Sequence, residues 1–471
     1  MLIGYFIGPF GAMLSSGIFT SILQNYFTDV LKLDLSFLSA LQWVSTLLIV
    51  AANLIVGQLI ERTRAMAGKA RPWILLSALT LSVACVLMFI VPSGETAKMI
   101  WIAIAYNLYY AIAYPIYNTA NSTLIAVSTR DSQKRGALAS FSNVAGLAVM
   151  GTGSMVFPIL VSFVLKEDQA MWFLVMLAVG VFTGLAAFLQ FKFTRERVTE
   201  ESLLRQESNT GRPTVSLKRQ LKAVTSESMW WVVVVFYLLF QWSGALKNGA
   251  MTFFCKWVLD NTFFGSADAW GASQSLLSIL GAIPMAVAAA FVVPLANRFG
   301  KRMIIFSGLV LGVAGGVVAG LGDGSVLPTG IGIALKCFGS APACYMILAM
   351  LADVIDHIEY KSRIRTDGLT MSIYSSIMVA ATPVCNAVFS ALLANSGYNQ
   401  LADPALGVLA QSAAVQRTIS MSYIWIETAV YAVCAVLILF FTVEKNLKNE
   451  QAEIAVRSAE SETYGRSTPI E

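Results

Sequence analysis

The sequence predicts an all-α membrane protein with twelve transmembrane helices in two six-helix bundles. Of its 471 residues, 57% are hydrophobic and only 13% are charged, about half the charged share of an average soluble protein. Twelve stretches are apolar for about 20 residues or more, which is the length that crosses a bilayer. A long polar segment, residues 192–228, divides these stretches six and six.

The twelve expected helices follow these apolar stretches in chain order. We place them at residues 2–28, 36–61, 72–92, 99–125, 137–165, 169–191, 229–256, 270–297, 302–321, 328–352, 368–396 and 418–443. The first stretch has neither a basic start nor a small-residue cleavage site, so we interpret it as a spanning helix and not as a signal peptide. The expected parts are an N-terminal bundle, a cytoplasmic connector, a C-terminal bundle and a disordered cytoplasmic tail, at residues 1–191, 192–228, 229–445 and 446–471.

Positive charge alternates sharply between successive loops. Twenty-five of the 32 Lys and Arg residues lie in every second loop, in the connector and in the tail, whereas the other loops contain Lys32, Lys98, Lys166 and Arg417. Basic loops stay on the cytoplasmic side. We therefore expect a multi-pass protein of the cytoplasmic (inner) membrane, embedded in the lipid bilayer with both termini cytoplasmic. The net charge of +5 reflects this orientation and does not indicate nucleic-acid binding.

Two loops at equivalent places in the two halves resemble one another. Residues 57–64 (GQLIERTR, followed by GKARP) close the second expected helix, and residues 294–302 (PLANRFGKR) close the eighth. A repeated basic loop with Gly is typical of a parallel duplication, although any tight inner loop favours the same residues. We expect two halves related by duplication.

The sequence argues against an enzyme. All six cysteines lie in apolar stretches, which indicates packing residues and not a disulfide framework. His357 is the only histidine, which argues against a His-based metal site or catalytic triad. Neither Gly68-Lys69 nor Gly300-Lys301 has the spacing of a phosphate-binding loop. We expect no catalytic residues, no metal and no cofactor.

Four parts of the sequence resemble one family of transporters. They are residues 61–64 (ERTR) with 68–73 (GKARPW), 26–30 (YFTDV), 248–251 (NGAM) with 254–259 (FCKWVL), and 351–361 (LADVIDHIEYK). These parts are similar to the glycoside–pentoside–hexuronide:cation symporters, the melibiose-permease branch of the major facilitator superfamily. The similarity spans most of residues 4–445. It implies the major facilitator fold and alternating-access transport of a sugar or glycoside, usually with Na⁺, H⁺ or Li⁺.

The acids that bind the coupling cation in that family are missing here. The resemblance places them one turn apart in the second helix, where this sequence has Ile49 and Asn53. A lone charge at mid-bilayer costs about 3 kcal/mol or more, so such a cluster is expected to disappear as a unit. The sequence therefore argues against coupling through this degenerate site. A facilitator, an exchanger and a symporter coupled through another group stay open, with Na⁺ and H⁺ as candidate ions.

The fourth expected helix carries the richest set of sugar-binding candidates. Tyr110, Tyr114, Asn118 and Asn121 recur at i, i+4, i+8 and i+11, which places them on one stripe of a regular helix. Aromatic faces stack on sugar rings, and amides and hydroxyls bind sugar hydroxyls, so we interpret the stripe as part of a substrate site. The alternative is that these residues bridge neighbouring helices.

The C-terminal half offers further substrate-binding candidates. Gln241 and Trp242 lie near the centre of the seventh expected helix, Lys247 lies further along it, and Lys336 lies in the tenth. Each lysine faces the cavity or extends its side chain toward the interface. Glu427 is the only acid near the middle of an expected helix. Such a residue is a functional hypothesis by default, here proton coupling, and pairing with a neighbouring helix is the alternative.

Charged residues at the inner helix ends are candidates for gating. Arg62 and Arg64 follow the second expected helix, and Asp353 and Asp356 lie at the inner end of the tenth. Such charges can latch the two halves in the outward-open state, although an exposed pair contributes only about 0–1 kcal/mol. A sugar-binding receptor or scaffold that kept the fold and lost transport is the alternative function.

Overall fold

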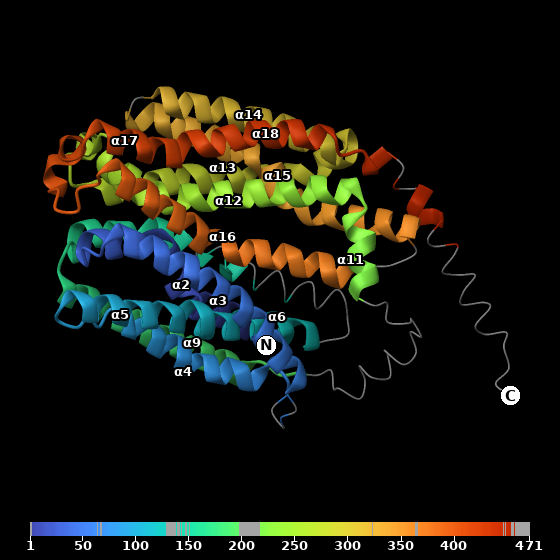
Figure 1. The fold of residues 1–471 in the computed structure, drawn as a ribbon, viewed down its shortest axis with the longest axis horizontal. Coiled ribbons are helices and arrows are strands. Elements are labelled where there is room, and N and C mark those ends of the chain that lie inside the picture. The colour runs from blue at the N-terminus through green and yellow to red at the C-terminus, as the bar shows by residue number, and fades with distance from the viewer. Residues whose placement is uncertain are drawn as a thin grey trace.

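The structure is a computed structural model that describes residues 2–63, 65, 68–128, 151–196, 217–322, 324–362, 366–445, 447, 449–453 and 456, with single residues between 138 and 149. Every regular element in these residues is a helix. In Figure 1 the N-terminal helices (blue to green) form one group, and the C-terminal helices (yellow-green to red) form a second group beside it.

The helices of the N-terminal half are interrupted by π-helical turns. Its elements are α1 (Leu2–Ala12), α2 (Leu14–Asn25), η1 (Tyr26–Val30), α3 (Leu35–Arg62), α4 (Arg71–Leu87), α5 (Glu95–Asn107), η2 (Leu108–Ala113), α6 (Tyr114–Val127), η3 (Thr152–Val156), α8 (Phe157–Leu160), η4 (Val161–Leu165) and α9 (Gln169–Phe193). Two of the π-helical turns, η2 and η3, directly precede helices that begin with a proline in the first turn, Pro115 and Pro158. Since proline has no N–H to donate to the preceding turn, the wider π-helical turn relieves the conflict.

The C-terminal half has longer uninterrupted helices. Its elements are α11 (Leu217–Thr225), α12 (Ser228–Trp257), η5 (Asn261–Phe264), α13 (Trp270–Phe299), α14 (Lys301–Leu321), α15 (Val326–Ser362), α16 (Asp367–Ser396), η6 (Pro404–Ala410), α17 (Ala413–Ser420), η7 (Met421–Trp425), α18 (Ile426–Leu439) and η8 (Val443–Lys445). Glycines bring α14 and α15 together, because a Cβ at Gly315 would lie 2.5 Å from the backbone nitrogen of Lys336. Such small residues allow close helix packing in membranes.

The described helices correspond to the twelve expected spans. Ten of them are long and apolar enough to cross a membrane, and the shorter apolar helices at Arg71–Leu87 and Thr152–Leu165 lie at the third and fifth expected spans. The fifth is described only from residue 151 onward, apart from single residues. The prediction of an all-α protein with twelve spans is confirmed.

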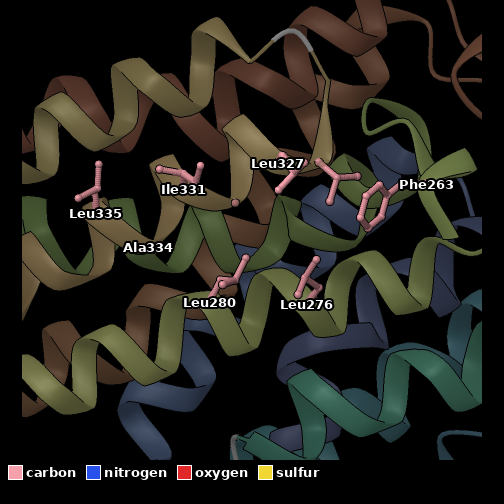
Figure 2. A pocket seen from close by; sticks show the side chains of 9 residues that line it. Phe263, Leu276, Leu280, Leu327, Ile331, Ala334 and Leu335 are labelled. Atoms are coloured by element: carbon pink, nitrogen blue, oxygen red, sulfur yellow. The ribbon is translucent and has the colours of Figure 1, made fainter.

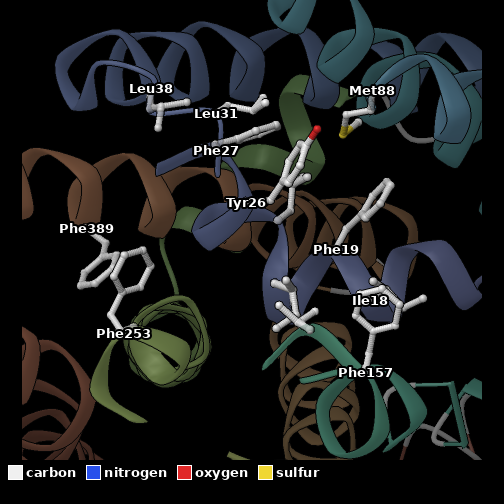
Figure 3. Close-up of a cluster of buried hydrophobic side chains, with 14 of the residues drawn as sticks. Ile18, Phe19, Tyr26, Phe27, Leu31, Leu38, Met88, Phe157, Phe253 and Phe389 are labelled. Atoms are coloured by element: carbon white, nitrogen blue, oxygen red, sulfur yellow. The ribbon is translucent and has the colours of Figure 1, made fainter. Parts of the chain in front are cut away.

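Among the residues that the structure describes, the two halves share one apolar core at one end of the bundle. We call this end, which bears Asp29, Lys256 and Tyr398, the closed end, and the opposite end, which bears Arg62 and Lys361, the basic end. Toward the closed end, buried residues of both halves form a single cluster, part of which is shown in Figure 3. Toward the basic end the buried residues form two separate clusters, one in each half.

The segments that lead into α4 and α14 carry equivalent helix caps. The carboxylate of Glu196 accepts hydrogen bonds from the backbone N–H groups of Lys69 (2.7 Å) and Ala70 (2.8 Å) at the start of α4. The carboxylate of Glu444 does the same for Lys301 (2.7 Å) at the start of α14. Negative charge at a helix N-terminus satisfies unpaired N–H groups and opposes the helix dipole. These matching contacts support the duplication.

The start of the tail differs from the sequence prediction. We expected residues 446–471 to be disordered, but Leu447 and Glu450 are buried, and residues 449–453 are helical. The Glu450 carboxylate lies 2.8 Å from Nδ1 of His357 on α15. The packed chain therefore extends to at least Glu453, because apolar and charged partners on α15 hold this segment.

Candidate functional site

The tyrosine stripe lies where η2 joins α6. Tyr110 and Tyr114 are half-buried, and Tyr110 packs on Tyr106 and Tyr109 with ring centroids 4.6 and 5.1 Å apart. The hydroxyl of Tyr109 lies 2.8 Å from that of Ser15 on α2, which ties the stripe to the first span. Tyr110 and Tyr114 border the apolar cluster that joins the two halves. The π-helical turn breaks the regular spacing from which the stripe was predicted.

The two asparagines of the stripe have different surroundings. Asn121 is buried, its side-chain oxygen accepts a hydrogen bond from Gln190 (2.8 Å), and its amide nitrogen donates to Ser142 (3.2 Å). Both partners belong to the N-terminal half, which favours the helix-bridging interpretation for Asn121. The side chain of Asn118 is half-buried and has no hydrogen-bond partner among the described residues. Of the two amides, that of Asn118 is the one available to a ligand.

Three charged side chains form a buried cluster in the C-terminal half. One carboxylate oxygen of Glu427 on α18 lies 2.6 Å from the ammonium of Lys336 on α15. The other lies 3.6 Å from the ammonium of Lys247 on α12 and accepts a 3.0 Å hydrogen bond from the hydroxyl of Tyr431. The structure thus brings together two lysines that the sequence had placed on separate helices, and it supplies their common counter-charge. Glu427, although on the twelfth span, is only 1% exposed.

Other substrate-binding candidates lie outside this cluster. Gln241 and Trp242 are half-buried on α12, and Trp242 borders the same apolar cluster as Tyr110. The indole nitrogen of Trp242 is buried without a hydrogen-bond partner among the described residues. It can therefore donate a hydrogen bond only after a local movement or the entry of a polar group.

The positions of the usual cation site hold no acid. Ile49 is buried, and the amide nitrogen of Asn53 donates a 2.9 Å hydrogen bond to the Ile49 carbonyl in the preceding turn of α3. This local bond occupies one donor of Asn53 and brings no negative charge. No cluster of three or more His, Cys, Asp or Glu residues suited to a metal ion occurs among the described residues.

The gating candidates do not connect the halves in this structure. Arg62 is exposed, and Arg64 lies outside the described residues. Asp353 pairs with Lys301 at 2.6 Å, and Asp356 accepts a 2.8 Å hydrogen bond from Gln451. These contacts stay within the C-terminal half, so the expected latch between halves is absent from the described part of the basic end. The expected latch would form in the state in which the basic end is closed. In this structure the opposite end is closed, so the latch is expected to be separated.

The contact that does join the halves was missed by the sequence analysis. Asp29, at the end of the first span, lies 2.5 Å from the ammonium of Lys256 on α12. The hydroxyl of Tyr398 donates a 2.8 Å hydrogen bond to the same carboxylate, and the indole of Trp257 donates to that hydroxyl at 2.8 Å. Asp29 and Lys256 both lie in the stretches that resemble the transporter family. Opposite charges near the ends of spans from different halves were the available signal.

Neutral hydrogen bonds reinforce this contact between the halves. The amide of Gln24 donates to the hydroxyl of Ser390 at 2.7 Å, and the hydroxyl of Thr252 donates to the carbonyl of Ser21 at 2.9 Å. Toward the closed end, α12 is buried continuously from Thr252 to Trp257, whereas no described side chain of α16 from Ile373 to Ala380 is buried. Packing and hydrogen bonding therefore join the two halves at the closed end, whereas the described side chains of α16 are less buried toward the basic end.

An apolar pocket on the outer surface is a separate feature. It has a volume of about 300 Å³ and lies between α13 and α15, with Phe263 at one end. Figure 2 shows Leu276 and Leu280 on one side and Leu327 and Ile331 on the other. Its lining offers no side-chain hydrogen-bonding group. It therefore does not suit a sugar.

Comparison with known proteins decides the family. A sequence model described as "MFS/sugar transport protein" matches residues 4–445. This chain belongs to that family. As an MFS protein it is a membrane transporter of sugars or glycosides and not an enzyme, and the resemblance noted in the sequence is confirmed.

Curated relatives of this MFS protein agree over most of their length. The chain is 26% identical to the isoprimeverose transporter of Lactiplantibacillus pentosus, over 94% of this chain and 88% of the relative. It is 27% identical to the putative glycoside/cation symporter YagG of Escherichia coli K12, over 80% and 79%. It is 20% identical to the glucuronide carrier protein homolog of the same organism, over 86% and 85%.

Solved structures confirm the fold of this MFS protein. The nucleoside transporter NupG superimposes with a TM-score of 0.62 at 12% identity, over 93% of this chain and 98% of the other. A bacterial homologue of the human lysosomal transporter Spinster gives a TM-score of 0.62 at 14% identity, over 95% and 97%. The structure therefore has the major facilitator fold of two six-helix bundles.

Proposed function

We propose that this protein carries a sugar or glycoside across the cytoplasmic membrane by alternating access, and that the structure represents its cytoplasm-facing state. The observation that carries the proposal is the asymmetry between the two ends. Apolar packing, the Asp29–Lys256 ion pair and the Gln24–Ser390 hydrogen bond join the halves at the closed end. At the basic end each half has its own core.

The orientation follows from the distribution of positive charge. Arg62, Lys301 and Lys361 lie at the basic end, together with other basic residues that the structure describes, such as Lys69, Arg71 and Lys222. Basic loops face the cytoplasm. The basic end is then cytoplasmic. The end at which each half has its own core therefore faces the cell interior, and transport requires the contacts at the closed end to separate.

Substrate hydroxyls would be bound by half-buried polar side chains of both halves. Tyr110 and Asn118 of the N-terminal half and Gln241 of the C-terminal half are half-buried and have no described side-chain hydrogen bond, whereas the half-buried Tyr114 has the side chain of Ser16 as a partner. Trp242 and the tyrosines would stack on the apolar face of a sugar ring. These residues border the core that joins the halves, so a ligand between them would contact both moving parts.

Coupling to a cation is proposed not to use the second span. Ile49 and Asn53 provide no negative charge to balance Na⁺ and no group that exchanges a proton at ordinary pH. Relatives include a putative glycoside/cation symporter, so a coupling role for Na⁺ or H⁺ through another group is the alternative. We favour an uncoupled facilitator or an exchanger.

Transport into proteoliposomes tests the proposal. Purified protein would be reconstituted and loaded with unlabelled glycoside, and the entry of labelled glycoside would be measured with and without Na⁺ and pH gradients. We expect counterflow that does not depend on either gradient. Net uptake driven by one gradient would overturn the uncoupled mechanism. Binding of sugar without any flux would instead favour the receptor or scaffold.

A further inference from the structure

We infer that the substrate of this transporter carries an acidic group, and that Lys247 binds it. The inference rests on the proposed function, since it concerns the same pathway, and it narrows the substrate class to anionic sugars such as uronic acids, their glycosides or sugar sulfonates. It starts from a charge imbalance in the cluster of Lys247, Lys336 and Glu427. Two ammonium groups there share a single carboxylate.

The imbalance is not corrected by any other described residue. No other acidic side chain lies within ion-pair distance of either lysine in the described ranges. Other polar neighbours of the cluster include the hydroxyl of Tyr431, the carbonyl of Ile424 and the thiol of Cys337, which bear no charge. Burying an unpaired charge is unfavourable. The cluster as it stands therefore attracts one further negative charge.

The two lysines differ in how fully they are satisfied. Lys336 is 1% exposed, lies 2.6 Å from Glu427 and donates a 3.1 Å hydrogen bond to the carbonyl of Ile424. Its ammonium also lies 5.8 Å from the centroid of the Tyr431 ring. These contacts surround Lys336 with partners on η7 and α18. Lys336 and Glu427 are therefore positioning residues, because they act on a ligand only through the charge they hold in place.

Lys247 is the member of the cluster that a ligand can reach. Its side chain is 20% exposed, and its single ionic contact, to Glu427, is 3.6 Å long. An ammonium group has three N–H donors, and the contact with Glu427 is the one interaction described for those of Lys247. The ammonium of Lys247 is thus both the exposed donor of the cluster and the place where a ligand can neutralise the excess positive charge. A carboxylate or sulfonate would neutralise that charge, whereas a neutral hydroxyl would not.

The rest of the ligand would extend toward the other half. Trp242 lies five residues before Lys247 on α12, and Trp242 borders the same apolar core as Tyr110 and Tyr114. A sugar ring beside these aromatic residues, with its acidic group on Lys247, would contact both halves at once. A charged anchor in one half and hydroxyl-binding groups in the other would make closure depend on the acidic substrate.

Matched pairs of ligands test the inference on the purified full-length protein. Methyl β-D-glucuronide would be compared with methyl β-D-glucoside, and galacturonate with galactose, by calorimetric titration and by counterflow. We expect the acidic member of a pair to bind at least about 30-fold more tightly, the ratio typical of a desolvated charge contact. This comparison uses the unaltered protein and does not depend on the folding of any variant.

Substitutions then assign the effect to Lys247. Lys247→Gln is expected to remove most of the preference for the acidic sugar while leaving the weak binding of the neutral sugar, and Lys247→Arg to restore part of it. Lys32→Gln is the matched control, because Lys32 is exposed and Glu167 is its one ion-pair partner among the described residues. The preference should survive that change. Equal loss of acidic and neutral binding in Lys247→Gln would indicate a merely structural role and overturn the assignment.

The outcomes separate this inference from the proposed function. Counterflow of neutral glycosides without binding of their acidic counterparts would overturn the inference and leave sugar transport standing. Absence of both binding and flux for every sugar would overturn the proposed function itself.

Discussion

The two buried charge clusters of this protein use the same chemistry in different places. Asp29, Lys256 and Tyr398 connect the two halves at the closed end, whereas Lys247, Lys336 and Glu427 lie within the C-terminal half. The first cluster is balanced in charge and has to break whenever the halves move apart. The second has an excess positive charge and moves as part of one rigid body. The two clusters contain similar groups. Their positions, between the halves or within one half, therefore decide whether a cluster holds a conformation or binds a ligand.

The largest expected effect comes from removing the centre of the second cluster. Glu427→Gln leaves Lys336 and Lys247 without a counter-charge, and breaking a buried ion pair on one side costs about 3–5 kcal/mol. We expect a large drop in the thermal unfolding temperature in detergent. Glu167→Gln is the control, because Glu167 is exposed and its ion pair in the described part of the chain is with the exposed Lys32. Equal stability of the two variants would contradict the buried network.

Breaking the first cluster should shift a conformation more than it unfolds the protein. Asp29→Asn removes the partner of Lys256 across the halves, which is expected to weaken the closed end by about 2–5 kcal/mol. Labelling of Thr252→Cys, in a background without the native cysteines, would report opening with an impermeant maleimide. We expect labelling to be faster by about tenfold or more.

A charge exchange serves as the control for this experiment. Asp29→Lys combined with Lys256→Asp keeps an opposite pair across the halves and should return labelling toward the slow rate. Fast labelling in the exchanged protein as well would show that the ion pair is not what holds the end closed.

A smaller effect is expected from the phenol of the first cluster. Tyr398→Phe removes the hydrogen bond to Asp29 and leaves the indole of Trp257 without its acceptor. Hydrogen bonds to charged groups contribute about 1.5–3 kcal/mol. The same labelling assay should show an intermediate rate between the unaltered protein and Asp29→Asn. A rate equal to that of the unaltered protein would show that Tyr398 does not support the latch.

The smallest predicted effect tests whether the halves are equivalent at their inner loops. Glu196→Gln and Glu444→Gln each remove a charged cap from the start of a helix, which is expected to cost about 0.5–2 kcal/mol. Thermal unfolding should show similar, modest losses in both. A loss confined to one variant would mean that the two caps are alike in geometry but not in strength.

The sequence was informative for those features that the bilayer itself constrains, namely the length and the apolar character of the spans. Runs such as residues 229–256 and 302–321 are long, apolar and nearly free of charge, so their spanning character needed no tertiary information. The repeated loops at 57–64 and 294–302 likewise predicted two halves related by duplication, which the matching caps by Glu196 and Glu444 support. Predictions failed where partners come from distant segments. The helical tail residues at 449–453 are held by α15, and Asn121 is occupied by Gln190, and neither partner is close in sequence.

The amino-acid sequence by itself determined the class of protein, its spans, its family and the absence of acids at Ile49 and Asn53, because each of these depends on local composition or on residues at short spacing. Only the tertiary structure decided which charges meet. Lys247, Lys336 and Glu427 belong to three helices, and Asp29 and Lys256 to different halves. Their pairing depends on how rigid helices rotate and pack, and a one-dimensional pattern does not contain that information.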